Sequence, residues 1–301
     1  MARRTRPRRS PGSPEAPTLP EGPVEIDTGT AHLERDPDHP ERVTLHVNGV
    51  PSSALDLADP GFLAFEYMQQ MAAVLALLPP GPLRVLHLGA AGCALARYVE
   101  HERPGSRQLG VDVDARLTTL VREWFALPRS PLLRLRADDA GRALEGVVPG
   151  SYDVVVRDVF ADDRTPEHLA GTAFAAAAHR ALRPGGVLLA NCADRPPLTL
   201  ARRELATLAR AFGGDAAAAG RLAAVAEPGV LKGRRYGNVV LVAVRAAEGE
   251  EDGAGAAGGP PARPDLGDPA LGRGLRTLAV PARLLAGDDV ARFVGTAAAL
   301  P

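Results

Sequence analysis

Residues 84–114, RVLHLGAAGCALARYVEHERPGSRQLGVDVD, form the stretch that decides the fold class. It reads in turn as an apolar strand, a turn rich in Gly and Ala, a helix, a second apolar strand and a group of acidic residues. Strand-like and helix-like segments continue to alternate up to about residue 245. Such alternation predicts an α/β fold of the Rossmann type, with a mostly parallel sheet and helices on both faces. The last two strands, AAVAEP and GNVVLVAVR, are expected to form an antiparallel pair.

The segment before this stretch predicts a small β structure followed by a helix. RVTLHVNGV, residues 42–50, alternates apolar and polar residues and turns at Asn48-Gly49, which is typical of a β-hairpin. In residues 61–80, apolar side chains recur at helical spacing until two prolines stop the helix. The predicted parts of the chain are a disordered Arg- and Pro-rich tail (1–23), an N-terminal β subdomain (24–60), a Rossmann-like nucleoside-binding domain (61–246), a linker rich in Gly, Ala and Pro (247–270) and a C-terminal docking segment with helical periodicity (271–301).

Composition and charge argue against several classes of function. Of the 301 residues, 46% are apolar and the net charge is −1, so no basic surface for nucleic acid is indicated. No apolar run reaches the roughly 18 residues that a membrane span needs, and no apolar segment follows the N-terminal arginines as in a secretion signal. Cys93 and Cys192 lie far apart without metal-ligand spacing, which favours a cytoplasmic protein without disulfides or a metal. The free edge of the N-terminal hairpin is compatible with a homodimer.

Acidic residues follow four of the five predicted parallel strands, where ligands bind on open sheets of this kind. A dinucleotide needs positive charge or neutral donors near its phosphates, and GAAGC, residues 89–93, departs from the G-x-G-x-x-G fingerprint. The crevice therefore suits a cationic ligand without phosphates. S-adenosylmethionine and its decarboxylated form each combine an adenosine with a sulfonium, and we expect one of them as co-substrate. The residues at the strand ends are 112–114, 138–139, 158–163 and 191–194.

The first candidates are residues that can hold a nucleoside. Gly89 and Gly92 let a backbone turn pass close to a nucleoside, although they also suit a tight turn without a ligand. Asp112 ends the second predicted strand, where an acid can accept both ribose hydroxyls. The alternative for an acid at this place is to cap a helix. That role suits Asp114 better, because it directly precedes ARLTTLV.

The acids after the third and fourth strands each have two interpretations. Asp138-Asp139 ends the third strand, where a carboxylate can read the adenine amino edge or cap the following helix. Asp158 follows the strand YDVVVR and is a candidate general base, since it would lie beside the reacting centre of a bound ligand. Its alternative is an ion pair with Arg157 or Arg164.

Residues around these acids are candidates for contact with a substrate. Asp162, on the loop after Asp158, can hold a cationic substrate or be solvated. Tyr67 and Gln70 lie on the helix before the first strand, where a phenol can hydrogen-bond an amine or pack in the core. No partner at metal-ligand spacing accompanies His168 or His179, so we expect both at the surface or in packing roles.

These motifs resemble the spermidine synthase (polyamine aminopropyltransferase) family, in particular its divergent bacterial members, from about Val43 to Arg245. The resemblance implies an N-terminal β-domain before a class I methyltransferase-like Rossmann domain. It also implies transfer of an aminopropyl group from decarboxylated S-adenosylmethionine to a small amine such as putrescine. The matching segments are RVTLHVNGV, FEYMQQM, VLHLGAAG, GVDVD, ADDA, YDVVVRDVF and LRPGGVLLAN.

The resemblance also implies roles for single residues. Asp158 matches the base that deprotonates the attacking amine, and Tyr67 matches, within one position, the tyrosine that helps to place it. The implied nucleoside site comprises Gly89 in its wall, Asp112 at the ribose, and Asp139 with the adjacent Ala140 at the adenine.

The chain departs from the family pattern around the amine. The family's glycine turn reads Gly-Gly-Gly-Asp-Gly, whereas residues 89–93 lack the acid. Its catalytic loop reads Asp-Ser-Ser-Asp-Pro, whereas residues 158–162 read DVFAD, and the usual Asp-Glu before the tyrosine is missing. Three functions follow from the fold and these residues: aminopropyl transfer to an amine, S-adenosylmethionine-dependent methyl transfer to a small molecule, and a non-catalytic binding role.

Overall fold

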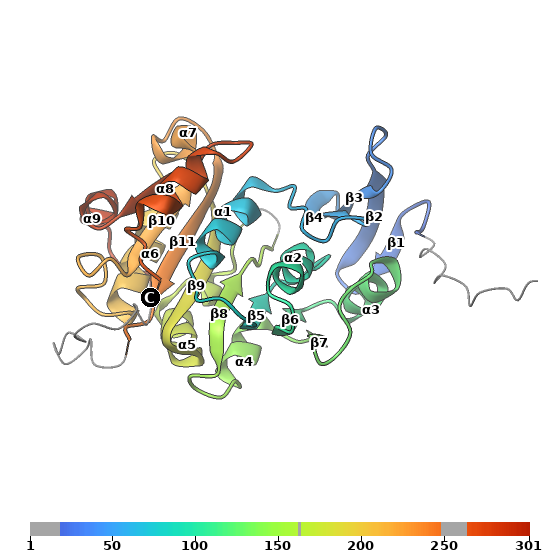
Figure 1. Ribbon diagram of the computed structural model, residues 1–301, viewed down its shortest axis with the longest axis horizontal. Helices are drawn as coiled ribbons and strands as arrows, with labels where there is room; N and C mark the ends of the chain where they lie inside the picture. Colours follow the sequence, from blue (N-terminus) through green and yellow to red (C-terminus); the bar gives the residue numbers. More distant parts are fainter. Residues whose placement is uncertain (1–18, 162–163, 248–263) are drawn as a thin grey trace, which may run out of the picture.

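The computed structural model describes residues 19–161, 164–247 and 264–301. These residues form two β-sheets (Figure 1), a four-stranded one in the order β1-β2-β3-β4 and an eight-stranded one in the order β12-β10-β11-β9-β8-β5-β6-β7. Most of the predicted N-terminal tail and of the predicted linker lies outside the described residues, as do Asp162 and Asp163.

The smaller sheet is antiparallel throughout and comes first in the chain. Its strands are β1 (Val24–Ile26), β2 (Gly29–Arg35), β3 (Arg42–Val47) and β4 (Val50–Asp56). Asn48 and Gly49 both have positive φ, 52° and 78°, as a tight two-residue hairpin turn requires, so the predicted hairpin is confirmed. Alternate side chains of these strands enter the hydrophobic core: Ala31, Leu33, Val43 and Leu45.

The larger sheet is parallel in its centre and antiparallel at one side. Its parallel strands are β5 (Arg84–Leu88), β6 (Arg107–Asp112), β7 (Leu133–Ala137), β8 (Tyr152–Arg157) and β9 (Leu182–Asp194). Its antiparallel members are β10 (Leu222–Ala226), β11 (Gly237–Val244) and β12 (Arg283–Ala286). The arrangement confirms the predicted α/β fold and the predicted antiparallel pair β10–β11.

The position of β5 fixes where a ligand is expected. β5 lies between β6 and β8 and runs parallel to both. The chain passes from β5 to β6 and β7 on one side and returns to β8 on the other, so the order reverses between β5 and β8. Ligands of open α/β sheets bind at such a switch point, outside the carboxyl ends of the strands. The turn after β5 and Asp158 after β8 flank this point.

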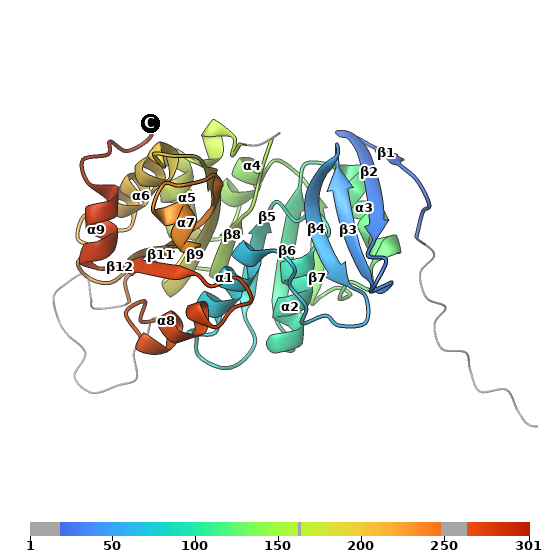
Figure 2. The same cartoon turned by 90° about the horizontal axis from the view of Figure 1, so that it is seen from above.

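Helices cover both faces of the larger sheet, so its strand residues alternate between two cores. Val156 belongs to the core on one face and Val155 to the core on the other. The first face is covered by α1 (Glu66–Leu75), α2 (Ala94–Glu102), α3 (Ala115–Trp124) and α8 (Pro269–Arg276). The second face is covered by α4 (Ala140–Glu145), α5 (Thr172–Ala181), α6 (Thr199–Ala211) and α9 (Asp288–Val294). Figure 2 shows α1 and α8 on one side of the sheet and α5 and α6 on the other.

Two segments differ from what the sequence predicts. The C-terminal segment, expected to be helical, contains β12 between α8 and α9, and β12 extends the sheet by pairing with β10. Its pattern RLLA is too short for periodicity to separate strand from helix. The helix expected over residues 166–182 begins only at Thr172, after a 3₁₀ turn (Glu167–Leu169). Gly171 stands at this break, and the backbone oxygen of Pro301 lies 2.2 Å from where a Cβ would be.

Candidate active site

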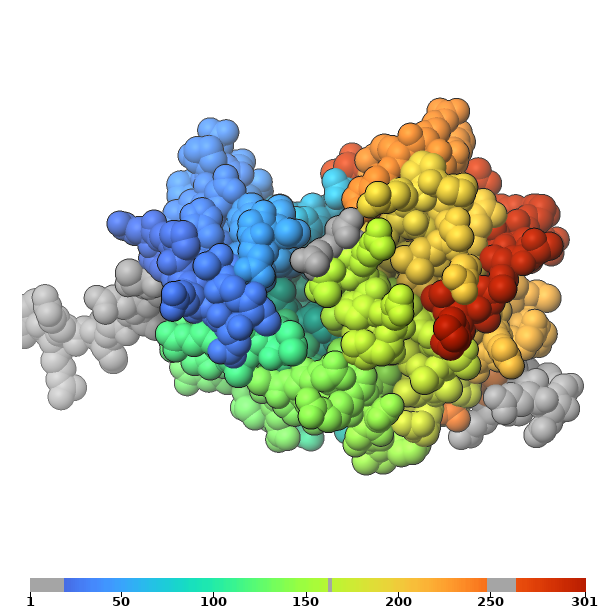
Figure 3. Space-filling view, turned by 180° about the vertical axis from the view of Figure 1, so that it is seen from behind, coloured from blue at the N-terminus to red at the C-terminus, as the bar shows by residue number. Residues whose placement is uncertain are grey.

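A small hollow lies where the N-terminal sheet, α1 and the turn after β5 meet. Its volume is about 40 Å³, and its lining includes Ser53 of β4, Met68 of α1, His87 of β5 and Asp158. Figure 3 shows the N-terminal sheet (blue) and the part around α7 (orange; Pro228–Leu231) standing on either side of a depression. The hollow therefore brings together segments that are far apart in the sequence.

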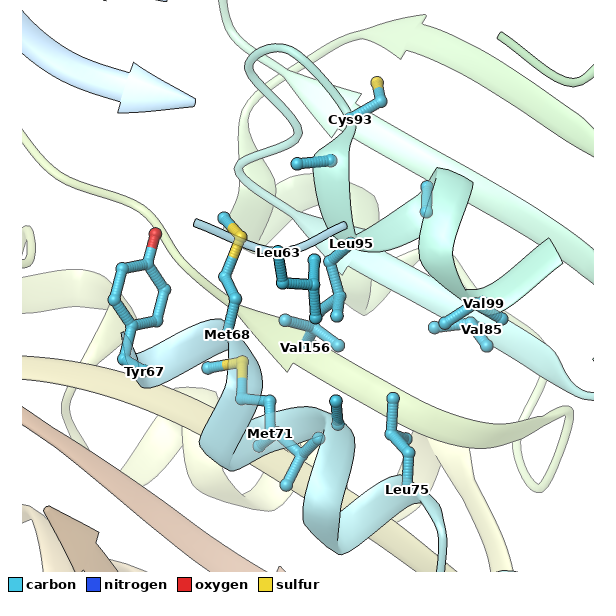
Figure 4. Packing of buried hydrophobic residues seen from close by; sticks show 14 of the residues in the cluster. Leu63, Tyr67, Met68, Met71, Leu75, Val85, Cys93, Leu95, Val99 and Val156 are labelled. Carbon is cyan, nitrogen blue, oxygen red and sulfur yellow. The ribbon is translucent and has the colours of Figure 1, made fainter. Parts of the chain in front are cut away.

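Asp158 is held by two neutral hydrogen-bond donors. The Tyr67 hydroxyl donates to Asp158 Oδ2 at 2.8 Å, and the Asn191 side-chain amide donates to Asp158 Oδ1 at 2.9 Å. Tyr67 and Asn191 are buried, with 8% and 1% of their surfaces exposed. Figure 4 shows the Tyr67 hydroxyl directed away from Met71 and Leu75, which pack elsewhere in the core. The candidate base and the candidate tyrosine are thus in direct contact.

The surroundings of this pair shift both pKa values upward. Burial raises the pKa of Asp158 above its ordinary 3.8, against the hydrogen bonds from Asn191 and Tyr67, which lower it. Burial, followed by the charge of Asp158, raises the pKa of Tyr67 well above 10.0. Tyr67 therefore stays protonated and keeps donating, while Asp158 is a better proton acceptor than a carboxylate in water.

The alternative role of Asp158, an ion pair with Arg157, does not fit the contacts of that arginine. Arg157 turns to the other face of the sheet, where its guanidinium contacts the carboxylate of Glu204 at 2.6 Å. It also donates to the backbone oxygens of Leu169 and Asn191.

Glycine at position 89 is required by close packing of the turn against β8. Gly89 has φ +82°, and a Cβ there would lie 2.2 Å from the backbone oxygen of Asp158. Ala91 and Cys93 also have positive φ, 37° and 61°, which is uncommon for residues with a side chain. Non-glycine residues hold such conformations only where the surroundings enforce them, and they are frequent at ligand sites.

Of the two acids at the end of β6, Asp114 has the capping role, and contact of Asp112 with a ribose stays a prediction. Asp112 accepts the backbone N–H of Ala91 at 3.0 Å and that of Asp114 at 3.1 Å, so its carboxylate holds the turn in place. Burial raises the pKa of Asp112, against these hydrogen bonds. Asp114 caps α3 by accepting the N–H of Leu117 at 2.6 Å, which confirms its predicted capping role. It also accepts both the N–H and the hydroxyl of Thr28, which fastens the N-terminal sheet to α3.

Asp139 has the capping role that the sequence offered as its alternative. It accepts the N–H of Arg142 at 2.9 Å at the start of α4, and it lies 3.2 Å from His168 Nε2. The neighbouring Asp138 forms ion pairs with Arg136 and Arg142. Asp139 still lies at the carboxyl edge of the sheet, and His168, expected to be a surface or packing residue, is exposed beside it. The buried Ala140 begins α4. Contact of Asp139 and Ala140 with adenine stays a prediction.

Three residues of the site carry no role in the sequence analysis. Ser53 reaches the hollow from the N-terminal sheet, and Asn191 binds Asp158 from β9. His87 is buried, its Nε2 lies 2.8 Å from Gln108 Oε1, and burial lowers its pKa to about 4, so it is neutral near pH 7. A histidine inside an otherwise apolar strand is the one signal that the sequence offered. The candidate Gln70 is also buried, and its Oε1 has no hydrogen-bond partner among the described residues.

The described residues show neither a cluster of metal ligands nor a membrane-spanning helix. Within the ranges that the structure describes, no group of three or more His, Cys, Asp or Glu side chains is arranged to hold a metal ion. In the same ranges, none of the helices is both long enough and apolar enough to cross a membrane.

The strand order, the glycine turn after β5 and the acid after β6 define a methyltransferase-like Rossmann protein. A scan against protein-family models found no match. The crystal structure of a probable spermidine synthase from Corynebacterium glutamicum is 35% identical in sequence and aligns with a TM-score of 0.80. That alignment covers 94% of this chain and 96% of the other. The chain therefore belongs to the spermidine synthase family, as a divergent member.

Other relatives are more distant. Polyamine aminopropyltransferases from Chromobacterium violaceum and Thioalkalivibrio sulfidiphilus are 27% identical over 139 residues and 30% identical over 129 residues. These alignments cover 46% and 42% of this chain, and the chain spans only about half the length of these relatives, 53% and 46%. Human methyltransferase-like protein 13, solved in complex with SAH, is 21% identical with a TM-score of 0.51. Its alignment covers 77% of this chain and 93% of the human chain, and it shows a likeness of fold alone.

Proposed function

We propose that the protein transfers an aminopropyl group from decarboxylated S-adenosylmethionine to an amine. The observation that carries the proposal is the contact of Asp158 with Tyr67 and Asn191 at the switch point of the sheet. Membership of the spermidine synthase family supports the same reaction. The proposal extends to amines as a class.

Aminopropyl transfer to an amine requires a group that accepts a proton, and a buried carboxylate can do so. An alkylammonium has a pKa of about 10.4, so an amine acceptor is protonated near neutral pH. It must lose a proton before it can act as a nucleophile. Asp158 first attracts the cation. The nitrogen lone pair of the neutral amine then forms the C–N bond, the C–S bond breaks, and its electron pair neutralises the sulfonium. The proton that the cation must lose before this attack passes to Asp158, whose pKa is raised by burial, and the product nitrogen keeps its two hydrogens as a secondary ammonium ion.

The donor would be held by the elements around the turn after β5. The nucleoside would lie in the depression outside the small hollow, because about 40 Å³ is room for a few water molecules only. Gly89 would let the backbone approach it, and the lone pairs of Asp112 not used by Ala91 and Asp114 would accept the ribose hydroxyls. Holding donor carbon and amine nitrogen in line supplies much of the rate.

Methyl transfer from S-adenosylmethionine is the second candidate, because one observation favours it. The turn at residues 89–93 contains no carboxylate, so it has no acid of its own to repel the carboxylate of S-adenosylmethionine. Competition calorimetry separates the candidates. Tighter binding of the decarboxylated form supports aminopropyl transfer, and tighter binding of S-adenosylmethionine supports methyl transfer. No heat from either would indicate a non-catalytic binding protein.

The proposal is tested by calorimetry with decarboxylated S-adenosylmethionine, followed by a product screen over diamines. Asp158→Asn should lower turnover at least about tenfold while nucleoside affinity stays within about twofold, because only the proton acceptor is lost. Asp153→Asn is the matched control. Asp153 is also buried but lies at the opposite end of β8, where it binds the backbone of Arg84. Turnover of Asp158→Asn equal to that of the control would remove Asp158 from the mechanism.

A further inference from the structure

Asn191 presents an unused buried acceptor next to the candidate base. Its side-chain nitrogen donates to Asp158 Oδ1. The carboxylate can only accept while ionised, so the amide must turn its nitrogen, and not its oxygen, toward Asp158. This leaves Asn191 Oδ1 buried and without a hydrogen-bond partner in the part of the chain that the structure describes. Buried polar atoms are rarely left unpaired, and each such atom requires an explanation.

The covalent geometry of the amide places this oxygen within reach of the same bound atom as Asp158. Nitrogen and oxygen of one amide are joined through a single carbon, so Asn191 Oδ1 lies at most about 5 Å from Asp158 Oδ1. One nitrogen atom can then lie at hydrogen-bond distance from both oxygens. The two oxygens differ in charge, since one belongs to a carboxylate and the other to a neutral amide.

The fold holds Asn191 firmly in this position. Side chains of β9 alternate between the two cores, so Asn191 shares the face of Leu189, toward α1, and Cys192 faces the opposite core. In the register of the sheet, Asn191 lies opposite Val240 of β11. Its backbone oxygen accepts a hydrogen bond from Arg157 at 2.7 Å. The strand is thus fixed from the far side of the sheet, and the amide has little freedom to turn.

We propose that Asn191 both positions Asp158 and selects primary amines as acceptors, an inference that rests on the proposed aminopropyl transfer. Its amide N–H₂ orients the carboxylate, and its Oδ1 accepts one N–H of the attacking nitrogen. A primary amine offers two N–H bonds, one to Asp158 and one to Asn191, and directs its lone pair at the donor carbon. A hydroxyl or a secondary amine has one hydrogen and leaves a buried acceptor unpaired, which disfavours it.

A carboxyl titration tests the positioning role without any co-substrate. The pKa of Asp158 is measured by NMR in protein labelled with ¹³C at the aspartate carboxyl carbon. Asn191→Leu removes a donor to the ionised form and should raise this pKa by about one pH unit. Tyr67→Phe should move it in the same direction. Cys192→Ala, a buried change at the next position on the opposite face, should leave it unchanged. A pKa in Asn191→Leu equal to that in Cys192→Ala overturns the inference.

A second measurement tests selectivity and keeps the two proposals separate. Wild-type kcat/KM for 1,4-diaminobutane should exceed that for its N,N′-dimethyl derivative at least about tenfold, and Asn191→Leu should reduce the ratio to about threefold or less. Asn191→Ala, which removes both the donor and the acceptor without adding bulk, serves if the leucine variant does not fold, and it should lower the ratio too. An unchanged ratio overturns the inference. Absence of any transfer by the wild-type protein, with a normal shift in the titration, contradicts the proposed function instead.

Discussion

Arg157 and Asp158 are consecutive residues at the end of β8, yet Arg157 is paired with an opposite charge and Asp158 is bound by neutral donors. On one face, Arg157 meets the carboxylate of Glu204 and two backbone oxygens. On the other face, Asp158 accepts hydrogen bonds from the neutral donors Tyr67 and Asn191 and borders the hollow. The contrast separates a charge that supports the fold from a charge that is left available for chemistry.

The physical reason lies in the cost of burying ions. A buried charge without a partner is costly, so structural ions are paired with an opposite charge. A carboxylate that meets neutral donors keeps its position while its charge stays uncompensated. It then binds a cation readily and accepts a proton at a higher pH than an exposed aspartate does. We expect Asp158 to behave in this way, whereas Arg157 is paired with Glu204.

The largest effect on stability is expected from breaking the ion pair between Arg157 and Glu204. Glu204→Leu leaves the guanidinium of Arg157 buried without its carboxylate and should lower the free energy of unfolding by about 3–5 kcal/mol. The double variant Arg157→Leu with Glu204→Leu should cost less than the sum of the single changes, because neither charge is left unpaired. Urea unfolding of the three variants and the wild type measures this. Additive losses would show that the pair is not coupled.

A smaller effect is expected from Asp158, in the way the stability of the protein depends on pH. The pKa of Asp158 is raised above 3.8 in the folded state, so between 3.8 and that raised value the folded protein binds more protons than the unfolded chain. Stability from this group is therefore complete below 3.8 and is lost as the pH rises through the folded pKa, by about 1.4 kcal/mol for each pH unit between the two pKa values.

The variant Asp158→Asn should remove this loss. Unfolding free energies of wild type and variant, measured across the pH range from about 4 to about 8, should diverge toward higher pH, with the variant gaining relative stability. Because every other titrating group is shared, the difference curve reports Asp158 alone. Two parallel curves would mean that the pKa of Asp158 is the same in the folded and unfolded states.

Single strands and their ends were predictable from the sequence because the information is local. An apolar run that ends in an acid identified the ends of β6 and β8, and with them Asp112 and Asp158. The N-terminal hairpin followed from alternation and from Asn48-Gly49. That Tyr67 and Asp158, 91 residues apart, serve the same site was implied only by the family resemblance, and their direct contact was not predicted. Here the family pattern supplied what local patterns cannot.

The rest depends on how elements pack together, which no single segment encodes. Asn191 reaches Asp158 because β9 lies beside β8 in one particular register, and a shift of one residue would turn its side chain to the other core. Ser53 reaches the hollow because the N-terminal sheet stands over the turn after β5. β12 was missed because four residues form a strand only where β10 offers an edge.

The smallest effect is expected where the same contrast recurs, at the end of β6. Asp114, two residues after Asp112, is a structural acid, and Asp114→Ala should cost about 1–2 kcal/mol of unfolding free energy through the lost cap of α3. Asp112→Asn should instead weaken binding of decarboxylated S-adenosylmethionine about tenfold, as loss of a ribose ligand requires. Urea unfolding and calorimetry measure the two effects. A large affinity loss in Asp114→Ala would contradict this division of roles.

The pH dependence of the two variants sharpens the contrast further. The pKa of Asp114 is lowered, since the hydrogen bonds from Leu117 and Thr28 outweigh the opposing effect of burial. Its contribution to stability is therefore present above 3.8 and is lost as the pH falls through the folded pKa. Asp158 has the opposite sign. Asp114→Ala should consequently lose least stability in acid, whereas Asp158→Asn should gain most at neutral pH. The direction in which stability changes with pH thus separates an acid that supports the fold, such as Asp114, from the proposed proton acceptor Asp158, and the measurement requires no substrate.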